Sequence, residues 1–333
     1  MLNENQEKLL VVENLTMEYV SQKRLFEKQK PSVKAVNDAS FYVLPGETFG
    51  IVGESGCGKT TLGKCIVRLL KPRTGKMFFN DEGEMKDLLA LNKKESFEMR
   101  KKLQIVFQDP YASLNPMHTI LQSFDEPMRI HGIGANTEER KVLIAEALKK
   151  VNLQPEYMYR YPHEFSGGQR QRICVAKALV LDPKLIVCDE PVSALDVSIQ
   201  AQLLNLMNKL QAELGVTFIF IAHDLSVVQY MSDRIGVMYL GNMVELADAD
   251  ELYNNTMHPY TEALLSAVPV PVINGKKDRI ILEGDVPSPM NPPSGCPFHP
   301  RCAKCMEICK QEKPVLGEKR DGHYVACHLF DNK

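Results

Sequence analysis

The sequence lacks any long apolar run. Its apolar stretches fall well short of the ~20 residues that a helix needs to cross a bilayer. The first residues, Met1–Glu7, are polar and acidic, whereas a secretory signal has a basic start followed by an apolar stretch. We therefore expect a chain that is neither exported nor membrane-spanning. If it works at a membrane, it must bind to another subunit.

A strong charge imbalance is also missing. The chain has 40 Lys and Arg residues against 42 Asp and Glu residues, a net charge of −2. Dedicated nucleic-acid-binding proteins usually carry a basic excess, so the composition argues against a nucleic-acid partner. No internal repeat and no long heptad run occurs, which argues against a coiled coil. The 333 residues, 44% of them hydrophobic, are enough for one large or two modest domains.

Hydrophobic patterning predicts an α/β protein. Residues 8–20 and 34–44 mix apolar and polar residues as antiparallel strands do, and the basic segment 21–32 between them is predicted to be an exposed loop. Continuous apolar runs separated by helices indicate a parallel sheet that is covered on both faces. These runs predict buried strands at 47–52, 185–188 and 217–222, and helical spacing predicts helices at 60–70 and 137–151.

A glycine-rich segment fits the pattern G-x-x-x-x-G-K-[ST] that cradles phosphates. It follows a predicted buried strand and precedes a predicted helix, as that pattern requires. Backbone N–H groups would surround the phosphates, the lysine would neutralise the β- and γ-phosphates, and the final threonine would bind Mg²⁺. A chance glycine turn before a helix is the alternative. The segment consists of Gly53, Glu54, Ser55, Gly56, Cys57, Gly58, Lys59 and Thr60, and Thr61 follows it.

Two carboxylates follow the buried strand at 185–188. The carboxyl ends of such strands are where α/β proteins bind ligands. Asp189 is a candidate Mg²⁺ ligand, and Glu190 is a candidate to activate or orient an attacking water. Taken alone, two solvated acids at a strand end would explain the pair equally well.

A second candidate anion site precedes that strand. Ser166, Gly167, Gly168 and Gln169 can present a hydroxyl and backbone N–H groups at a helix start, although an ordinary helix cap has the same sequence. The stretch Phe165–Arg172 resembles the signature of ABC-family ATPases. In that family the signature of one subunit closes over the nucleotide of another, so the resemblance implies an ATP-hydrolysing pair of subunits.

The resemblance implies further site residues. Gln108 resembles the Q-loop glutamine that contacts Mg²⁺ and the attacking water, and Asp196 resembles the D-loop aspartate at the dimer interface. His223 resembles the switch histidine that contacts the γ-phosphate. Tyr19 is the candidate aromatic that stacks on the base, and Phe26 competes for that role. Mg²⁺ would be bound by Thr60, Gln108 and Asp189.

Longer stretches resemble the ATPase subunits of bacterial oligopeptide and dipeptide permeases (the OppF/DppF type). They include Phe107–Pro116, Cys188–Ser198, His258–Thr261 and Asn291–Cys296. This resemblance implies the ABC ATPase fold, with a RecA-like parallel-sheet core, an antiparallel β subdomain, an α-helical signature subdomain and a small Cys-rich extension. We place the ATPase domain at residues 8–255 and the extension at 256–333.

The implied function is an ATP-binding and ATP-hydrolysing subunit of a peptide importer on the cytoplasmic face of the membrane. Its implied partners are a second, related ATPase subunit in a heterodimer, two transmembrane permease subunits and an extracytoplasmic peptide-binding protein. The alternatives are a soluble ABC ATPase, an importer of another small solute such as nickel, and a non-enzymatic interaction or redox module built on the cysteine tail. The intact Asp189 and Glu190 argue against the last of these.

Five of the nine cysteines lie between Cys296 and Cys327. This Pro-rich tail has little apolar content, and small domains of that kind usually need a cross-link, such as a disulfide or a bound metal, to be stable. A zinc site, an iron–sulfur cluster and unmetallated thiols are all compatible with the spacing. Resemblance to permease ATPases that carry a [4Fe–4S] cluster favours Cys296, Cys302, Cys309 and Cys327 as ligands, with Cys305 as a spare.

Overall fold

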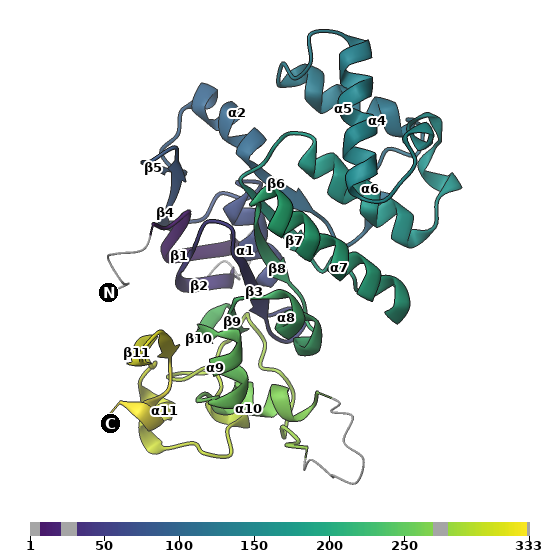
Figure 1. The fold of residues 1–333 in the computed structure, drawn as a ribbon. Helices are drawn as coiled ribbons and strands as arrows, with labels where there is room; N and C mark the ends of the chain where they lie inside the picture. Colours follow the sequence, from purple (N-terminus) through teal and green to yellow (C-terminus); the bar gives the residue numbers. More distant parts are fainter. Residues whose placement is uncertain (1–6, 21–31, 269–278, 332–333) are drawn as a thin grey trace, which may run out of the picture. The chain divides into compact units, whose positions relative to one another are not determined.

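The computed structural model describes residues 7–20, 32–268 and 279–331. The chain divides into two compact units. Figure 1 shows the fold as a ribbon with its helices and strands labelled. Unit 1 contains residues 44–48 and 90–221. Unit 2 contains the described residues of 8–43, 49–89 and 222–331.

Unit 1 combines a parallel sheet with a group of helices. Strands β6, β7 and β8 pair in parallel in the order β8-β7-β6, as their continuous apolar runs predict. Every residue of β7 and β8 is buried. The elements are α2 (Lys93–Lys102), β6 (Leu103–Val106), α3 (Pro110–Ser113), α4 (Ile120–Ile130), α5 (Thr137–Lys150), α6 (Gly167–Leu179), β7 (Leu185–Asp189), α7 (Val197–Leu214) and β8 (Thr217–Ile221).

The helices α4, α5 and α6 contact one another and form the helical part of unit 1 (Figure 1). Their apolar faces bury Phe124, Ile144 and Leu148 completely. A half-buried ion pair between Asp125 of α4 and Arg140 of α5, with an oxygen–nitrogen distance of 2.6 Å, adds to the packing. This part carries α6, whose first residues are the predicted signature.

Unit 2 contains two sheets. The first is antiparallel in the order β2-β1-β4-β5, and it confirms the two strands predicted at 8–20 and 34–44. The strands of the second lie in the order β11-β12-β10-β9-β3, where only β9 and β3 are parallel. The elements are β1 (Leu10–Val20), β2 (Ser32–Val43), β3 (Thr48–Val52), α1 (Lys59–Ile66), β4 (Thr74–Asp81), β5 (Glu84–Asp87), α8 (Leu225–Met231), β9 (Arg234–Tyr239), β10 (Asn242–Asp248), α9 (Ala249–Asn254), α10 (Pro259–Ser266), α11 (Glu307–Gln311), β11 (Gly317–Arg320) and β12 (His323–Val325).

The structure differs from the sequence prediction at two places in unit 2. The helix predicted at 60–70 ends at Ile66, because Arg68 has a left-handed backbone (φ 60°) and the N–H groups of Leu69 and Leu70 both donate to the carbonyl of Lys64. The antiparallel pairs β9–β10 and β11–β12 were not predicted. Of the loop predicted at 21–32, residues 21–31 lie outside the described residues, and Ser32 begins β2. Among the described helices, none has both the length and the apolar composition to cross a bilayer.

A buried polar cluster connects the C-terminal residues to β10. The Glu245 side chain is fully buried and its Oε1 lies 2.8 Å from Nε2 of His323, which is also fully buried. Glu245 also accepts hydrogen bonds from the backbone N–H groups of Met257 (2.7 Å) and His258 (3.2 Å). Burial lowers the pKa of His258 to about 4, so that ring is neutral and its Nδ1 accepts from the N–H of Tyr260. One carboxylate therefore connects two segments of the C-terminal residues, Met257–His258 and β12, to β10.

Candidate functional site

The candidate phosphate loop connects β3 to α1 in unit 2. Gly58 precedes α1 with a left-handed backbone (φ 108°), and a Cβ there would lie 1.9 Å from the carbonyl oxygen of Ala35. Only glycine fits both conditions. The carbonyl of Cys57 accepts from the N–H of Gly241 in the β9–β10 turn (2.8 Å), which holds the loop from its other side. Ser55 and Gly56 are exposed at the tip of the loop.

Lys59 lies beneath this loop and is almost fully buried. Its Nζ donates to the carbonyl oxygens of Gly53 (2.7 Å) and Glu54 (3.0 Å), so the ammonium is held by the loop that it is predicted to serve. Burial raises the pKa of the neighbouring Cys57 thiol, and the Lys59 charge partly opposes that rise. Thr60 and Thr61 follow in the first turn of α1 and are half-buried. The sequence prediction of a strand, a glycine turn and a helix is therefore confirmed here.

The candidate catalytic carboxylates lie in unit 1 at the end of β7. Asp189 is the buried last residue of the strand, and Glu190 follows with a left-handed backbone (φ 47°) that turns the chain sharply. The turn is fixed because the Glu190 N–H donates to Ile221 of β8 and the Glu190 carbonyl accepts from Ser193. Gln108 Nε2 donates to Glu190 Oε2 at 3.4 Å. The structure thus brings together the predicted Q-loop glutamine and the predicted catalytic glutamate, which are 82 residues apart.

The candidate signature begins α6. Ser166 is the N-cap: its Oγ accepts from the N–H of Gln169 (3.3 Å), and its own N–H donates to Gln169 Oε1 (3.0 Å). This capping box gives Ser166 and Gln169 a local structural role. The cap does not explain the glycines. A Cβ on Gly168 would lie 2.4 Å from Ile199 of α7, so close packing of the two helices requires that glycine.

The candidate D-loop lies beside the signature in unit 1. A Cβ on Gly167 would lie 3.6 Å from Leu195, in van der Waals contact. Asp196 caps α7 by accepting from Ser198 Oγ (2.7 Å) and the Ile199 N–H (3.0 Å), and these hydrogen bonds lower its pKa. The next residue, Val197, is 81% exposed. The signature and D-loop therefore form one surface with an exposed apolar side chain.

Two further predicted site residues belong to unit 2. His223 is exposed in unit 2, directly before the N-cap of α8. Tyr19 is 44% exposed near the end of β1, where it pairs with Val33 of β2. Its competitor Phe26 lies outside the described residues.

Four of the tail cysteines line one small enclosed cavity of about 10 Å³, together with His258, Phe298, His299 and His328. The four are Cys296, Cys302, Cys309 and Cys327, and Cys305 is not among the lining residues. Burial raises the pKa of Cys296 and of Cys327 to about 11, and the neighbouring thiols add to each rise. Within the described residues, no group of three or more His, Cys, Asp or Glu side chains is arranged to bind a metal ion.

Sequence reasoning missed two residues that contact the candidate phosphate loop. Both lie in the C-terminal part of the chain: Tyr260 of α10 accepts a hydrogen bond from the Glu54 N–H (2.9 Å), and Arg301 forms an ion pair with the Glu54 carboxylate (2.8 Å). Tyr260 lies in a stretch that carried the family resemblance, but nothing in the local pattern connects it to a residue 206 positions away.

Comparison with known proteins agrees with this geometry. Residues 36–193 match a family model described as ABC transporter, and residues 244–309 match one described as the C-terminal region of oligopeptide/dipeptide transporters. The chain is 51% identical to a putative oligopeptide transport ATP-binding protein of Bacillus subtilis, YkfD, over 97% of this chain and 96% of that protein. It is 48% identical to the oligopeptide transport ATP-binding protein OppF of Haemophilus influenzae, over 98% of each.

Solved structures give the same result. A dimeric ATP-binding cassette, MJ0796, in a post-hydrolysis state with ADP and Pi is 29% identical, with a TM-score of 0.62, and the match covers 72% of this chain and 99% of that one. CbiO1 of Clostridium perfringens, part of the cbiONQ transporter complex, is 26% identical with the same TM-score, over 75% and 92% of the two chains. The protein is an ATPase with the ABC ATPase fold. The chain therefore belongs to the ABC transporter family, among the oligopeptide transport ATP-binding proteins.

Proposed function

We propose that this chain is the ATP-hydrolysing subunit of an importer of oligopeptides or dipeptides. One observation carries the proposal: a chain with a phosphate loop and a signature continues into a region that matches the C-terminal region of oligopeptide/dipeptide transporters. Three relatives with about half of their residues identical are named for oligopeptide transport, and others at similar identity are named for peptide transport or import.

We assign the following roles within that function. The loop formed by residues 53–61 encloses the ATP phosphates, with Lys59 as the cation and Thr60 as a Mg²⁺ ligand. Asp189 and Gln108 are the further Mg²⁺ ligands, Glu190 orients the attacking water, and His223 contacts the γ-phosphate. Tyr19 stacks on the base. The 3.4 Å contact between Gln108 and Glu190 supports a joint action of these two side chains on the water.

The working unit is a pair of ATPase subunits, most simply this chain and a related partner. Residues 166–169 and Asp196 face the nucleotide of that partner, which is supported by the single surface that they form and by the exposed Val197 beside it. The pair binds peripherally to two transmembrane permease subunits on the cytoplasmic face of the membrane. A peptide-binding protein delivers the cargo from outside.

The test is reconstitution of this chain with its candidate partner ATPase and permease subunits in proteoliposomes. ATP hydrolysis that rises when a peptide-loaded binding protein is added supports the proposal. If ATP hydrolysis rises only with a nickel-loaded binding protein, the cargo is nickel and not a peptide. Full activity of the purified chain with no association to permease subunits would assign a soluble ABC ATPase.

We further propose that the four cavity-lining cysteines hold a [4Fe–4S] cluster, with zinc as the second candidate. Thiolates are the usual ligands of such clusters, and these four come from separate segments of a region with a small apolar core. When bound, the cluster supplies a covalent connection between those segments. The protein's own contribution is to bury Cys296, Cys309 and Cys327, to half-bury Cys302 and to keep Cys305 off the cavity lining.

Iron and sulfide analysis of anaerobically purified protein tests this assignment. Cys302→Ser should remove most of the iron and sulfide, whereas Cys305→Ser, the matched control three residues away, should retain both. One zinc per chain without sulfide would replace the cluster with zinc. Equal losses in the two variants would refute the ligand set.

A further inference from the structure

The candidate phosphate loop carries a negative charge of its own. Glu54 is its second residue, and its carboxylate is 25% exposed at the side-chain level. A carboxylate next to bound phosphates repels them, and its partial burial weakens the screening of that repulsion by water. A second cation, in addition to Lys59, would neutralise this carboxylate and remove the repulsion.

Arg301 supplies that cation from the extension. Its Nη1 lies 2.8 Å from Glu54 Oε2 and its Nη2 lies 3.0 Å from Glu54 Oε1, which is the two-pronged geometry that makes guanidinium–carboxylate pairs strong. The Arg301 side chain is only 7% exposed, so solvent screens the pair weakly. On the other side of Glu54, its backbone N–H donates to Tyr260 (2.9 Å).

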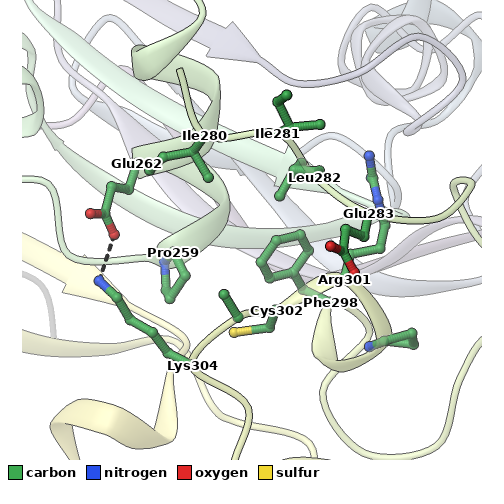
Figure 2. Close-up of a pocket in the computed structure, with 12 residues that line it drawn as sticks. Pro259, Glu262, Ile280, Ile281, Leu282, Glu283, Phe298, Arg301, Cys302 and Lys304 are labelled. Atoms are coloured by element: carbon green, nitrogen blue, oxygen red, sulfur yellow. Dashed lines mark hydrogen bonds and ion pairs between the residues drawn. The ribbon is translucent and has the colours of Figure 1, made fainter. Parts of the chain in front are cut away.

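The position of Arg301 is fixed by the fold of the extension. It ends a short 3₁₀ helix, His299–Arg301, and its N–H donates to the carbonyl of Phe298 (3.0 Å). Phe298 is buried against the rings of Tyr239 and Tyr260. Figure 2 shows Arg301, Phe298 and Cys302 lining the same pocket, which has a volume of about 240 Å³. Packing thus holds the Arg301 guanidinium beside Glu54, and moving it away would disrupt that packing.

We propose that Arg301 is a positioning residue for ATP binding: it neutralises the Glu54 carboxylate and fixes the second residue of the phosphate loop in place. This inference rests on the proposed phosphate-binding role of residues 53–60. It gives the C-terminal extension a direct part in nucleotide affinity, in addition to any part in assembling the transporter.

The test compares nucleotide affinities of the full chain by equilibrium titration. Arg301→Gln should weaken ATP binding by about tenfold or more, because it leaves the Glu54 carboxylate uncompensated. The loss should be smaller for ADP and absent for adenosine, since the repulsion scales with phosphate charge. Glu54→Gln alone should bind ATP at least as tightly as the native chain, and the double variant Glu54→Gln/Arg301→Gln should regain most of the lost affinity.

A purely structural role predicts a different pattern, in which either single substitution weakens all ligands and the double variant is no better. That pattern would overturn the proposal, as would native ATP affinity in Arg301→Gln. If Arg301→Gln does not fold, the Glu54→Gln variant tests the proposal alone. A loss of tenfold or more in its ATP affinity would refute the claim that Arg301 serves to neutralise Glu54.

Lys304→Met is the matched control, since it breaks an exposed ion pair with Glu262 in the same region and should bind ATP normally. Failure of the native chain to bind ATP would instead refute the phosphate-binding role itself.

Discussion

Replacing Glu245 by Gln should destabilise unit 2 strongly. Glu245 and His323 are both fully buried, and removal of one partner from a buried pair typically costs about 3–5 kcal/mol. Glutamine retains one acceptor for the N–H of Met257 or His258, so we expect the lower end, about 3 kcal/mol. For a cooperative unit of this size that corresponds to a fall in Tm of roughly 6–12 °C.

The pH dependence should change as well. Burial lowers the pKa of His323 and is the largest single effect, but the hydrogen bonds and charges of Glu245 and Glu251 together outweigh it, so the pKa is raised overall. A raised pKa means that the pair stabilises the fold fully below about pH 6.5 and loses this contribution as pH rises through the folded-state value. In Glu245→Gln burial dominates. His323 is then neutral in the folded state, and stability should instead fall as the solution is acidified.

Calorimetric unfolding between pH 6 and pH 9, without nucleotide, measures both effects. Glu251→Gln is the matched control, because Glu251 contacts the other nitrogen of His323 at 3.4 Å but is partly exposed, so its loss should lower Tm much less. A Glu245→Gln variant with native Tm, or with the native slope of stability against pH, would refute the reasoning.

Three further predictions concern the nucleotide motifs. Glu190→Gln should lower the rate of ATP hydrolysis by about 100-fold or more while ATP binding is retained, and near-normal hydrolysis in the reconstituted transporter would contradict the assigned role. Ser166→Ala should cost about 1 kcal/mol of stability, because the helix cap of α6 is lost. Ser166→Asn, which keeps a capping side chain, should restore stability but not ATP hydrolysis. Recovered hydrolysis in the Asn variant would show that Ser166 acts only as a helix cap. Gly58→Ala should abolish ATP binding in titrations, because its Cβ would overlap the carbonyl of Ala35, and measurable affinity would show that the loop can shift.

Elements with a strong local signal could be predicted from the sequence. The strands β3, β7 and β8 are continuous apolar runs with no polar face, and the phosphate loop combines a fixed residue pattern with the elements on either side of it. The capping box at Ser166 is equally local. These features depend on residues within a few positions of each other, so a single sequence contains the information.

Features that depend on distant contacts could not be predicted. Helix α1 ends at Ile66 although apolar spacing continues, since the next residues turn back to bond the carbonyl of Lys64. The pair between Glu54 and Arg301 joins residues 247 positions apart, and the pair between Glu245 and His323 joins residues 78 apart. A charge in a sequence pairs with any of many opposite charges, and only the fold selects one.

Strand β12 has a consequence for synthesis of the chain. It pairs with the outer edge of β10 through two residue pairs, Glu245 with Val325 and Leu246 with Tyr324. About 75 residues separate β10 from β12 in the chain, so a ribosome adding roughly 5–20 residues per second leaves that edge unpaired for about 4–15 s. During this interval the nascent β10 can pair with a neighbouring chain, as exposed strand edges do. The strand order therefore exposes this edge to misassembly while the chain is still being synthesised.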